Sequence, residues 1–391
     1  MPVIDGAGSN LDRRRFLQLS AGAALAATAG ASLTGCLKAS VVTSADHGPL
    51  LPVDANGLQL PAGFSSRIIA TTGQVVPGTS YTWHTAPDGG ACFPTAGGGW
   101  IYVSNCEWIP GGAGMVRFDA AGAIVGAGPI LTGSIINCAG GATPWGTWLS
   151  CEEWDGGQVF ECDPTGATPG VARPAMGKFK HEAAAVDPVR GHVYLTEDSP
   201  TGALYRFAPT TPGDLSAGTL EVLTQVGLTL AWATVPNPQS YSPIPTRDQV
   251  PNAKRFNGGE GICYTDDCVW FTTKGDNRVW FYDIALNLCG PFYDRANEVA
   301  PQLSGVDNIT VRIGEESGAV WYVAEDGADM EVVGVQFDGA TFPLCRLTGV
   351  TGSEITGPAF SPDGSRLYFS SQRNPGRTYE ITGPFLPNPH G

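Results

Sequence analysis

The sequence predicts an all-β protein folded as a β-propeller of about six blades. Gly and Pro together make up 84 of the 391 residues (53 and 31), which is high for a helical protein and typical of many short strands joined by turns. β-Branched and aromatic runs with alternating polarity recur along the chain, and turn signals separate them. Because the same group of strands returns repeatedly, the chain is predicted to form a ring of small antiparallel sheets.

Six copies of one pattern follow one another. Each has a first strand, a turn, a second strand that ends in small or polar residues, and a third strand. Asp-Pro, Asp-Gly and Gly-Gly pairs fall where hairpins need them. The copies begin with CFPTAGGGW, GATPWGTWL, HEAAAVDPV, GEGICYTDD, DNITVRIGE and TGPAFSPDG.

The repeats define one propeller domain over residues 64–391, preceded by a leader or linker over 36–63. Two stretches, 208–254 and 284–306, lack clear periodicity and are expected to be loops or a lid between blades. The rival interpretation is a β-sandwich, but the sixfold recurrence of the pattern argues against it.

The N-terminus carries an export signal. Residues 13–15 are three arginines, and Phe16 and Leu17 follow them, which is the pattern of a twin-arginine signal. The apolar stretch that follows is too short and too rich in Ala and Gly to favour a membrane span. It ends in LTGC at residues 33–36, a lipobox, so we expect lipid on Cys36. The sequence thus predicts the twin-arginine export machinery as a partner, a membrane anchor at Cys36, and a periplasmic or cell-envelope location; residues 1–35 would be removed.

The composition limits the classes of ligand and partner that the protein is expected to bind. The formal net charge is −15, which excludes nucleic acid as an expected partner, since phosphate binding needs a surplus of Lys and Arg. An acidic balance instead suits multivalent cations with hard oxygen ligands. The chain has ten cysteines, and an exported protein is permitted disulfides. Cys106 and Cys151 end the second strands of neighbouring blades, which suggests a bridge between them.

Acidic and amide residues recur at equivalent places in the repeats. The first strand of a blade lines the central channel, and three such strands begin with Glu182, Glu260 and Asp307. Adjacent strands run antiparallel, so the end of the second strand lies beside the start of the first. Both sets are therefore expected at one mouth of the channel, where repulsion between carboxylates would raise their pKa values and favour bound cations. The second set contains Asn105 and Glu107, Glu152 and Glu153, Glu197 and Asp198, Asp276 and Asn277, and Glu325 and Asp326, and Glu354 precedes the sixth blade.

Three segments resemble the PhoX-type alkaline phosphatases. They are NCAGGATPWGTWLSCEE (137–153), GKFKHEAAAVDPVRGHVYLTEDS (177–199) and ITGPAFSPDGSRLYFSSQR (355–373). The resemblance covers most of the chain from about Ala91, and the first segment is its most specific element. It implies a twin-arginine-exported propeller that hydrolyses phosphate monoesters, a small-molecule substrate, outside the cytoplasmic membrane.

The resemblance also implies a site with ferric iron and calcium bridged by oxygen, and a cysteine thiolate on the iron. Carried over by motif, the thiolate is Cys138. Arg255 is implied as the phosphate-binding arginine, and Asn105 would donate a further hydrogen bond to the substrate. The metal ligands carried over, besides the cysteine, are Glu152, Glu153, Glu182, Glu260 and Asp307.

The chain departs from the family pattern in two places. It has Asn105-Cys106-Glu107 where the family commonly has Asn-His-Glu, and the spacing from Arg255 to Glu260 is longer. Two alternatives therefore stay open: a calcium-dependent propeller hydrolase acting on phosphodiesters, phosphotriesters or lactones, and a non-catalytic envelope lipoprotein. A serine hydrolase is disfavoured because the sequence contains no Gly-x-Ser-x-Gly.

Overall fold

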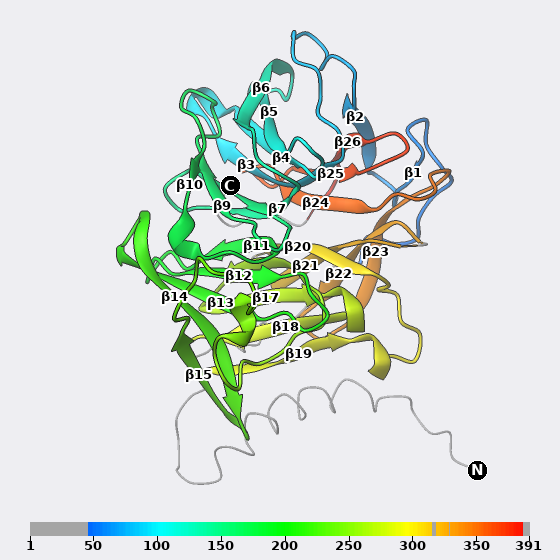
Figure 1. Ribbon diagram of the computed structural model, residues 1–391. Helices are drawn as coiled ribbons and strands as arrows, with labels where there is room; N and C mark the ends of the chain where they lie inside the picture. The colour runs from blue at the N-terminus through cyan, green and yellow to red at the C-terminus, as the bar shows by residue number, and fades with distance from the viewer. Residues whose placement is uncertain (1–45, 315–317, 328, 386–391) are drawn as a thin grey trace, which may run out of the picture.

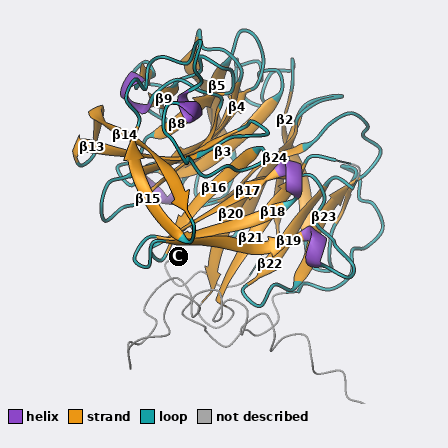
Figure 2. Cartoon of the chain, turned by 60° about the horizontal axis from the view of Figure 1, so that its bottom comes forward, coloured by secondary structure: helices purple, strands orange, loops and turns teal. Residues whose placement is uncertain are grey.

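The computed structural model describes residues 46–314, 318–327 and 329–385. Within them, antiparallel strands form six sheets arranged as the blades of a ring (Figure 1). The helical elements there are short 3-10 turns between strands (Figure 2). None of the helices described is long and apolar enough to cross a membrane. The predicted six-bladed propeller is confirmed.

The first three blades follow one another along the chain. Blade one consists of β3 (Pro87–Pro94), β4 (Trp100–Cys106), β5 (Gly112–Phe118) and β6 (Ile124–Thr132). Blade two consists of β7 (Asn137–Ala142), β8 (Trp148–Glu152), β9 (Val159–Cys162) and β10 (Val171–Ala172). Blade three consists of β11 (His181–Val186), β12 (Val193–Glu197), β13 (Leu204–Thr211), β14 (Asp214–Val226) and β15 (Thr229–Thr234).

The other three blades complete the ring. Blade four consists of β16 (Gly259–Thr265), β17 (Cys268–Thr273), β18 (Arg278–Asp283) and β19 (Leu288–Asp294). Blade five consists of β20 (Val306–Gly314), β21 (Gly318–Glu325), β22 (Glu331–Gln336), β23 (Thr341–Leu347) and the edge strand β1 (Leu58–Gln59). Blade six consists of β24 (Ile355–Phe360), β25 (Arg366–Ser371), β26 (Arg377–Thr382) and β2 (Ser65–Thr71).

Two stretches expected to be irregular contain strands. The region 208–254 holds the long hairpin β14–β15, and 284–306 holds β19, so the expectation of loops is wrong for these strands. The stretches 235–254 and 295–305 contain only loops and short 3-10 turns, as expected. The hairpin twists away from the body of blade three, as Figure 1 shows. The segment expected as a leader likewise contributes β1, and Leu58 within it is fully buried against blade five. These stretches become ordered by packing against a neighbouring blade. Such packing leaves no periodic pattern in the local sequence from which it could be predicted.

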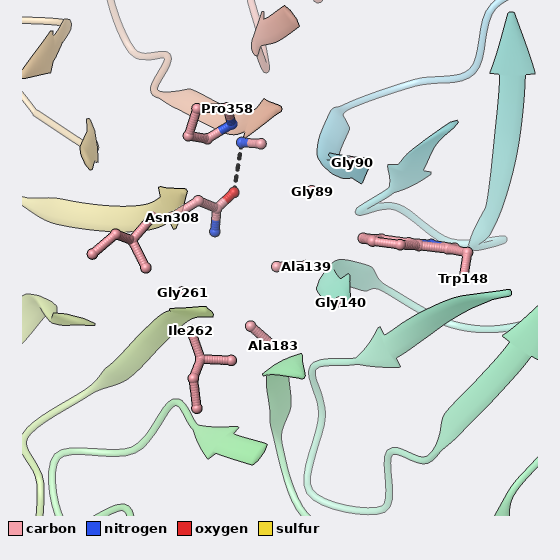
Figure 3. Close-up of a pocket in the computed structure, with 12 residues that line it drawn as sticks. Gly89, Gly90, Ala139, Gly140, Trp148, Ala183, Gly261, Ile262, Asn308 and Pro358 are labelled. Atoms are coloured by element: carbon pink, nitrogen blue, oxygen red, sulfur yellow. Dashed lines mark hydrogen bonds between the residues drawn. The ribbon is translucent and has the colours of Figure 1, made fainter. Parts of the chain in front are cut away.

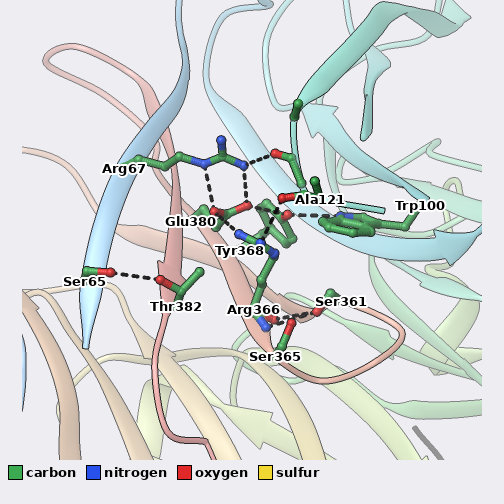
Figure 4. Close-up of polar contacts among 12 residues, drawn as sticks. Ser65, Arg67, Trp100, Ala121, Ser361, Ser365, Arg366, Tyr368, Glu380 and Thr382 are labelled. Atoms are coloured by element: carbon green, nitrogen blue, oxygen red, sulfur yellow. Dashed lines mark hydrogen bonds and ion pairs between the residues drawn. The ribbon is translucent and has the colours of Figure 1, made fainter. Parts of the chain in front are cut away.

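The ring is closed by pairing β2 from the N-terminal side with β26 from the C-terminal side. Glu380 on β26 accepts hydrogen bonds from Arg67 on β2, from Arg366 and from Tyr368, and Trp100 of blade one donates to the Tyr368 hydroxyl (Figure 4). We call this group the closure cluster. It joins the two ends of the propeller to blade one, which leaves no open gap between the first and last blades.

Six inner strands, β3, β7, β11, β16, β20 and β24, neighbour one another around the axis. Small residues let them approach closely near the middle of the channel, where Ala139, Ala183 and Gly261 face its narrow centre (Figure 3). A Cβ on Gly141 would lie only 1.9 Å from the carbonyl oxygen of Ala184 in the next blade. The Oδ1 of Asn308 accepts a hydrogen bond from the Gly357 N–H at 2.6 Å and ties blades five and six together there (Figure 3).

Candidate metal centre

The start of every inner strand has the same local distortion. Each inner strand pairs with its neighbour at its first residues, and the register then shifts before regular pairing resumes. Such a bulge changes the direction of the side chains within it. The second residues of the six strands occupy equivalent places, and all but the last of them line one cavity: Asp88, Cys138, Glu182, Glu260, Asp307 and Thr356.

The end of the second strand in each blade supplies another set. The residue that follows this strand lies at the same mouth, as the antiparallel pairing predicts. In blade four this residue is a cation instead of a carboxylate, and in blade six it is an amide. The six residues are Glu107, Glu153, Asp198, Lys274, Asp326 and Gln372, and the first five line the cavity.

The cavity has a volume of about 180 Å³, and we call it the acidic cavity. Nine carboxylates and the Cys138 thiol line it, with Lys274 and Arg373 as the cations among its lining residues. Lys274 Nζ lies 3.2 Å from a Glu260 oxygen and 3.3 Å from an Asp326 oxygen. Negative groups therefore far outnumber the positive groups that face them.

The second cation, Arg373, comes from blade six, two blades away from Lys274. Its Nη2 lies 3.4 Å from Glu107 and 3.3 Å from Glu354. Next to it, Gln372 donates to Asp88 at 2.6 Å and also to Glu107. The cations thus stand in different blades, with most of the carboxylates left without a positive partner between them.

Burial and mutual repulsion strongly raise the pKa values of the carboxyl groups. Burial, with a contribution from Asp198, raises the pKa of Glu153 to about 8. Burial, with contributions from Asp307 and Asp88, raises the pKa of Glu354 to about 9. The pKa of Asp307 rises to about 7, again mainly through burial, although Lys274 opposes the rise. Several of these groups would hold protons at neutral pH unless cations replaced them.

The donor atoms meet the spacing that metal ions require. Three groups of side chains each place one ligand atom within 4.8 Å of the others: Asp88, Glu107 and Cys138; Cys138, Glu153 and Glu182; and Glu182, Glu260 and Asp307. Successive groups share a residue, so they form a continuous row across the cavity. The donors fit hard cations through their oxygens, and Cys138 adds a soft donor where the first two groups meet.

Cys138 lies beside the carboxylates, with its Sγ 3.1 Å from Oε1 of Glu182. The thiol is buried, and burial together with the Asp88 and Glu182 charges raises its pKa well above the usual value. A cysteine in such surroundings is a thiol unless a cation stabilises the thiolate. The site therefore fits a metal that accepts both sulfur and oxygen.

Five of the six residues expected as ligands lie together at the acidic cavity: Cys138, Glu153, Glu182, Glu260 and Asp307. Glu152 does not. Its Oε1 accepts the Ile135 N–H at 2.9 Å and its Oε2 accepts the Gln158 N–H at 3.1 Å. Neighbouring residues of a strand point to opposite sides, so Glu152 holds the loops of blade two while Glu153 faces the cavity. The expectation of Glu152 as a ligand is corrected accordingly.

The two residues expected to contact substrate lie elsewhere. Arg255 is exposed and pairs with Asp248 at 2.7 Å, outside the acidic cavity. Asn105 is completely buried; its amide donates to the Ala139 carbonyl at 2.8 Å and accepts from Trp148 Nε1 at 2.9 Å. Its side chain therefore fastens blade one to blade two behind Cys138 and has no free donor for a substrate.

The expected Cys106–Cys151 bridge is also absent, because both residues are free thiols in the structure.

Sequence reasoning missed Asp88, Lys274 and Arg373. Asp88 escaped because the first repeat was begun at Cys92, four residues after it, whereas β3 starts at Pro87. Aligning the starts of the other inner strands would have found it. Lys274 directly follows the second strand of blade four, and Arg373 comes two residues after that of blade six, whereas the repeat pattern singles out only acidic and amide groups at these places.

The family model of the alkaline phosphatase PhoX matches residues 112–157 and 154–284, which run from β5 to the end of β18. No curated protein matches the sequence. Among solved structures, PhoX of Pseudomonas fluorescens in complex with vanadate, a transition state analogue, superposes with a TM-score of 0.69 at 16% identity, over 86% of this chain and 97% of that chain.

Two further structures share the fold. XC5397 from Xanthomonas campestris, a gluconolactonase, matches with a TM-score of 0.50 at 12% identity, over 86% of this chain and 98% of that chain. A protein of unknown function from Bacteroides thetaiotaomicron matches with a TM-score of 0.53 at 8% identity, over 82% and 76%. At these identities the structural likenesses establish the propeller, and the family model adds a sequence match over residues 112–284.

Proposed function

We propose that this chain, which the family model of the alkaline phosphatase PhoX matches over residues 112–284, hydrolyses phosphate monoesters at its acidic cavity with the help of bound iron and calcium. The observation that carries the proposal is the row of three donor groups joined through Cys138 and Glu182. Nine carboxylates around about 180 Å³ are costly to hold together without cations. Bound cations can in turn withdraw charge from a phosphoryl group.

The residues that would hold the metal ions are those of the row. Cys138, with Glu153 and Glu182, offers sulfur and oxygen to iron. Glu182, Glu260 and Asp307 offer oxygen alone, which suits calcium. Asp88 and Glu107, on the other side of the thiol, extend the donor set. Bound there, the ions would act as Lewis acids that polarise the phosphoryl oxygens.

The chain's own contribution to phosphate binding would come from Lys274 and Arg373, in place of Arg255. Arg373 is half exposed at 45% and is held by two carboxylates, so its guanidinium is oriented and accessible. A planar guanidinium binds two phosphate oxygens at once. Lys274 is more enclosed, and it would offset negative charge that the reacting group brings to the opposite side of the cavity.

Export and anchoring are part of the proposal. The twin-arginine signal and the lipobox both lie outside the described residues. We infer that the chain crosses the membrane folded, through the twin-arginine machinery, and stays attached to the cell envelope through Cys36. Labelling of cells with a radioactive fatty acid tests this: the wild-type protein should carry the label, and Cys36→Ala should not. A label that survives the substitution would contradict the anchor.

The function is tested with the exported mature protein. Elemental analysis should find iron and calcium, and para-nitrophenyl phosphate should be hydrolysed. An absorption band from thiolate-to-iron charge transfer should vanish in Cys138→Ala. A colourless protein that hydrolyses lactones or phosphodiesters with calcium would contradict the phosphatase assignment. A protein with neither metal nor turnover would leave only a binding role for the propeller.

A further inference from the structure

A second pocket lies directly beside the acidic cavity, between blades two and three. Its volume is about 90 Å³, and Asp155, Lys178, Lys180, Glu197, Tyr241 and Arg247 are among its lining residues. We call it the lysine pocket. Three of these positions lie one or two residues away from members of the acidic cavity: 155 from 153, 180 from 182, and 197 from 198. The two spaces are therefore neighbours at the same mouth.

The wall of the lysine pocket is a built structure. The segment 237–249 folds over it and is fastened to the strand that leads into β11, because the Lys178 N–H donates to the Pro238 carbonyl at 2.8 Å and the Thr246 hydroxyl donates to the Lys178 carbonyl. Arg247 on this segment pairs with Glu197 at 2.6 Å. The pocket thus has a fixed shape on both sides.

The two lysines stand on either side of a buried aromatic ring. Phe179 between them stacks on Tyr205 with ring centroids 4.1 Å apart. Lys178, Phe179 and Lys180 all line the pocket. The buried ring therefore fixes this short segment and keeps both lysines at one space.

The positive charge of the lysine pocket is not neutralised from within. Among the described residues neither Lys178 nor Lys180 forms an ion pair, although Glu152 lies within electrostatic range of Lys178 and Glu153 within that of Lys180. Arg247 already neutralises Glu197, and Asp155 is exposed to solvent, which screens its charge. The full sequence has only five lysines, at 38, 178, 180, 254 and 274. Three of them, at 178, 180 and 274, stand at this one mouth of an otherwise acidic protein.

We propose that the lysine pocket binds a second anionic group, carried by the alcohol part of the substrate while its phosphate occupies the acidic cavity. This rests on the proposed function. The substrate class is phosphate monoesters whose alcohol bears a carboxylate or a second phosphate. Two unpaired ammonium groups attract such a group, and the edge of Tyr241, packed against Trp154 with ring centroids 6.2 Å apart, offers an apolar side to the carbon skeleton between the two anions.

Matched esters test the proposal with the metal-loaded mature protein. Para-carboxyphenyl phosphate and benzene para-bisphosphate carry the second anion, and para-carbamoylphenyl phosphate is the neutral match in shape. We expect wild-type kcat/KM to favour the doubly anionic esters, and Lys178→Gln to reduce that preference about fivefold while turnover of the neutral ester stays near wild type. Lys254→Gln, which removes the same charge from a lysine bonded to Gln225, should leave the preference unchanged.

Binding gives a readout without turnover. The affinities of para-carboxyphenyl and para-carbamoylphenyl phosphonate, measured by calorimetry, should differ in the wild type and converge in Lys178→Gln. Preference for carboxylate alone, or for phosphate alone, would fix which anion the pocket accepts. Hydrolysis of all esters with equal preference in wild type and Lys178→Gln overturns the lysine pocket and leaves the phosphatase standing. If none of the esters is hydrolysed, both the lysine pocket and the phosphatase assignment are overturned.

Discussion

The closure cluster and the acidic cavity use the same chemical group in opposite ways. In the closure cluster a single buried carboxylate, Glu380, meets two arginines and a tyrosine hydroxyl. In the acidic cavity nine carboxylates share one lysine and one arginine. The first arrangement satisfies its charge within the protein and holds the ring shut. The second leaves charge unsatisfied, and this is the condition under which a site attracts ions.

The difference follows from position in the blade. Glu380 lies on β26, where β2 brings one arginine and β25 brings a second arginine and a tyrosine, whose hydroxyl also accepts a hydrogen bond from blade one. The carboxylates of the acidic cavity lie where inner strands begin, and each blade adds a similar residue there. Sixfold repetition around an axis concentrates like charges, whereas the single junction between the chain ends allows unlike charges to meet.

The largest effect is expected from removing the residue shared by two donor groups. Glu182→Gln should lower kcat for para-nitrophenyl phosphate by at least about 100-fold, because even residues behind metal ligands change activity by 10–100-fold. Metal content by elemental analysis should fall in parallel. Glu221→Gln, which breaks only the surface pair with Arg206, serves as the control, and full activity in Glu182→Gln would refute the metal assignment.

The next effect is a pH dependence of the unfolding free energy, which should be much stronger when metals are removed. The pKa values of Glu153 and Glu354 are about 8 and about 9 in the folded chain, above those of unfolded glutamate. The stability that such a group contributes is fully present below its pKa in the unfolded chain. It is lost as pH rises through its pKa in the folded chain. Metal-free protein should therefore lose a few kcal/mol of unfolding free energy between pH 5 and pH 9, measured in urea. Protein with metals should lose much less; equal slopes would argue against bound cations.

A substitution in the closure cluster should lower the unfolding free energy and leave the catalytic activity unchanged. Glu380→Gln leaves Arg67 and Arg366 without a charged acceptor and should cost about 2 kcal/mol of unfolding free energy, a figure reduced because Arg67 is 42% exposed. Urea unfolding measures the loss. Activity per folded molecule should remain at the wild-type level, since the cluster lies outside the acidic cavity; a specific loss of kcat would break the contrast between the two regions.

The smallest effect separates two arginines. Arg373→Ala should lower kcat/KM for a phosphate monoester by about tenfold, because it removes a charge-assisted contact at the acidic cavity. Arg255→Ala removes only an exposed pair with Asp248 and should change kcat/KM by less than about twofold. Steady-state kinetics on both variants decides between them, and the reverse order would restore Arg255 as the phosphate-binding residue.

Much of this protein is determined by its sequence alone. Alternating strands and turn pairs gave the propeller and its number of blades, because both are local patterns repeated along the chain. The antiparallel rule then placed Glu107, Glu153, Asp198 and Asp326 at the mouth with Glu182, Glu260 and Asp307, and the structure brings all seven to the acidic cavity. The residue types and the approximate location of the site were therefore predictable.

Only the tertiary structure decided which polar residues belong to the site. Glu152 and Glu153 are neighbours in sequence, yet strand geometry turns the first toward backbone N–H groups and the second into the cavity. Asp88 joins because its strand has the same bulge as the other five, and Arg373 joins because closure of the ring returns residue 373 to the side of residue 107. Bulges and ring closure depend on pairing between distant segments, so no local pattern encodes which side chains finally meet.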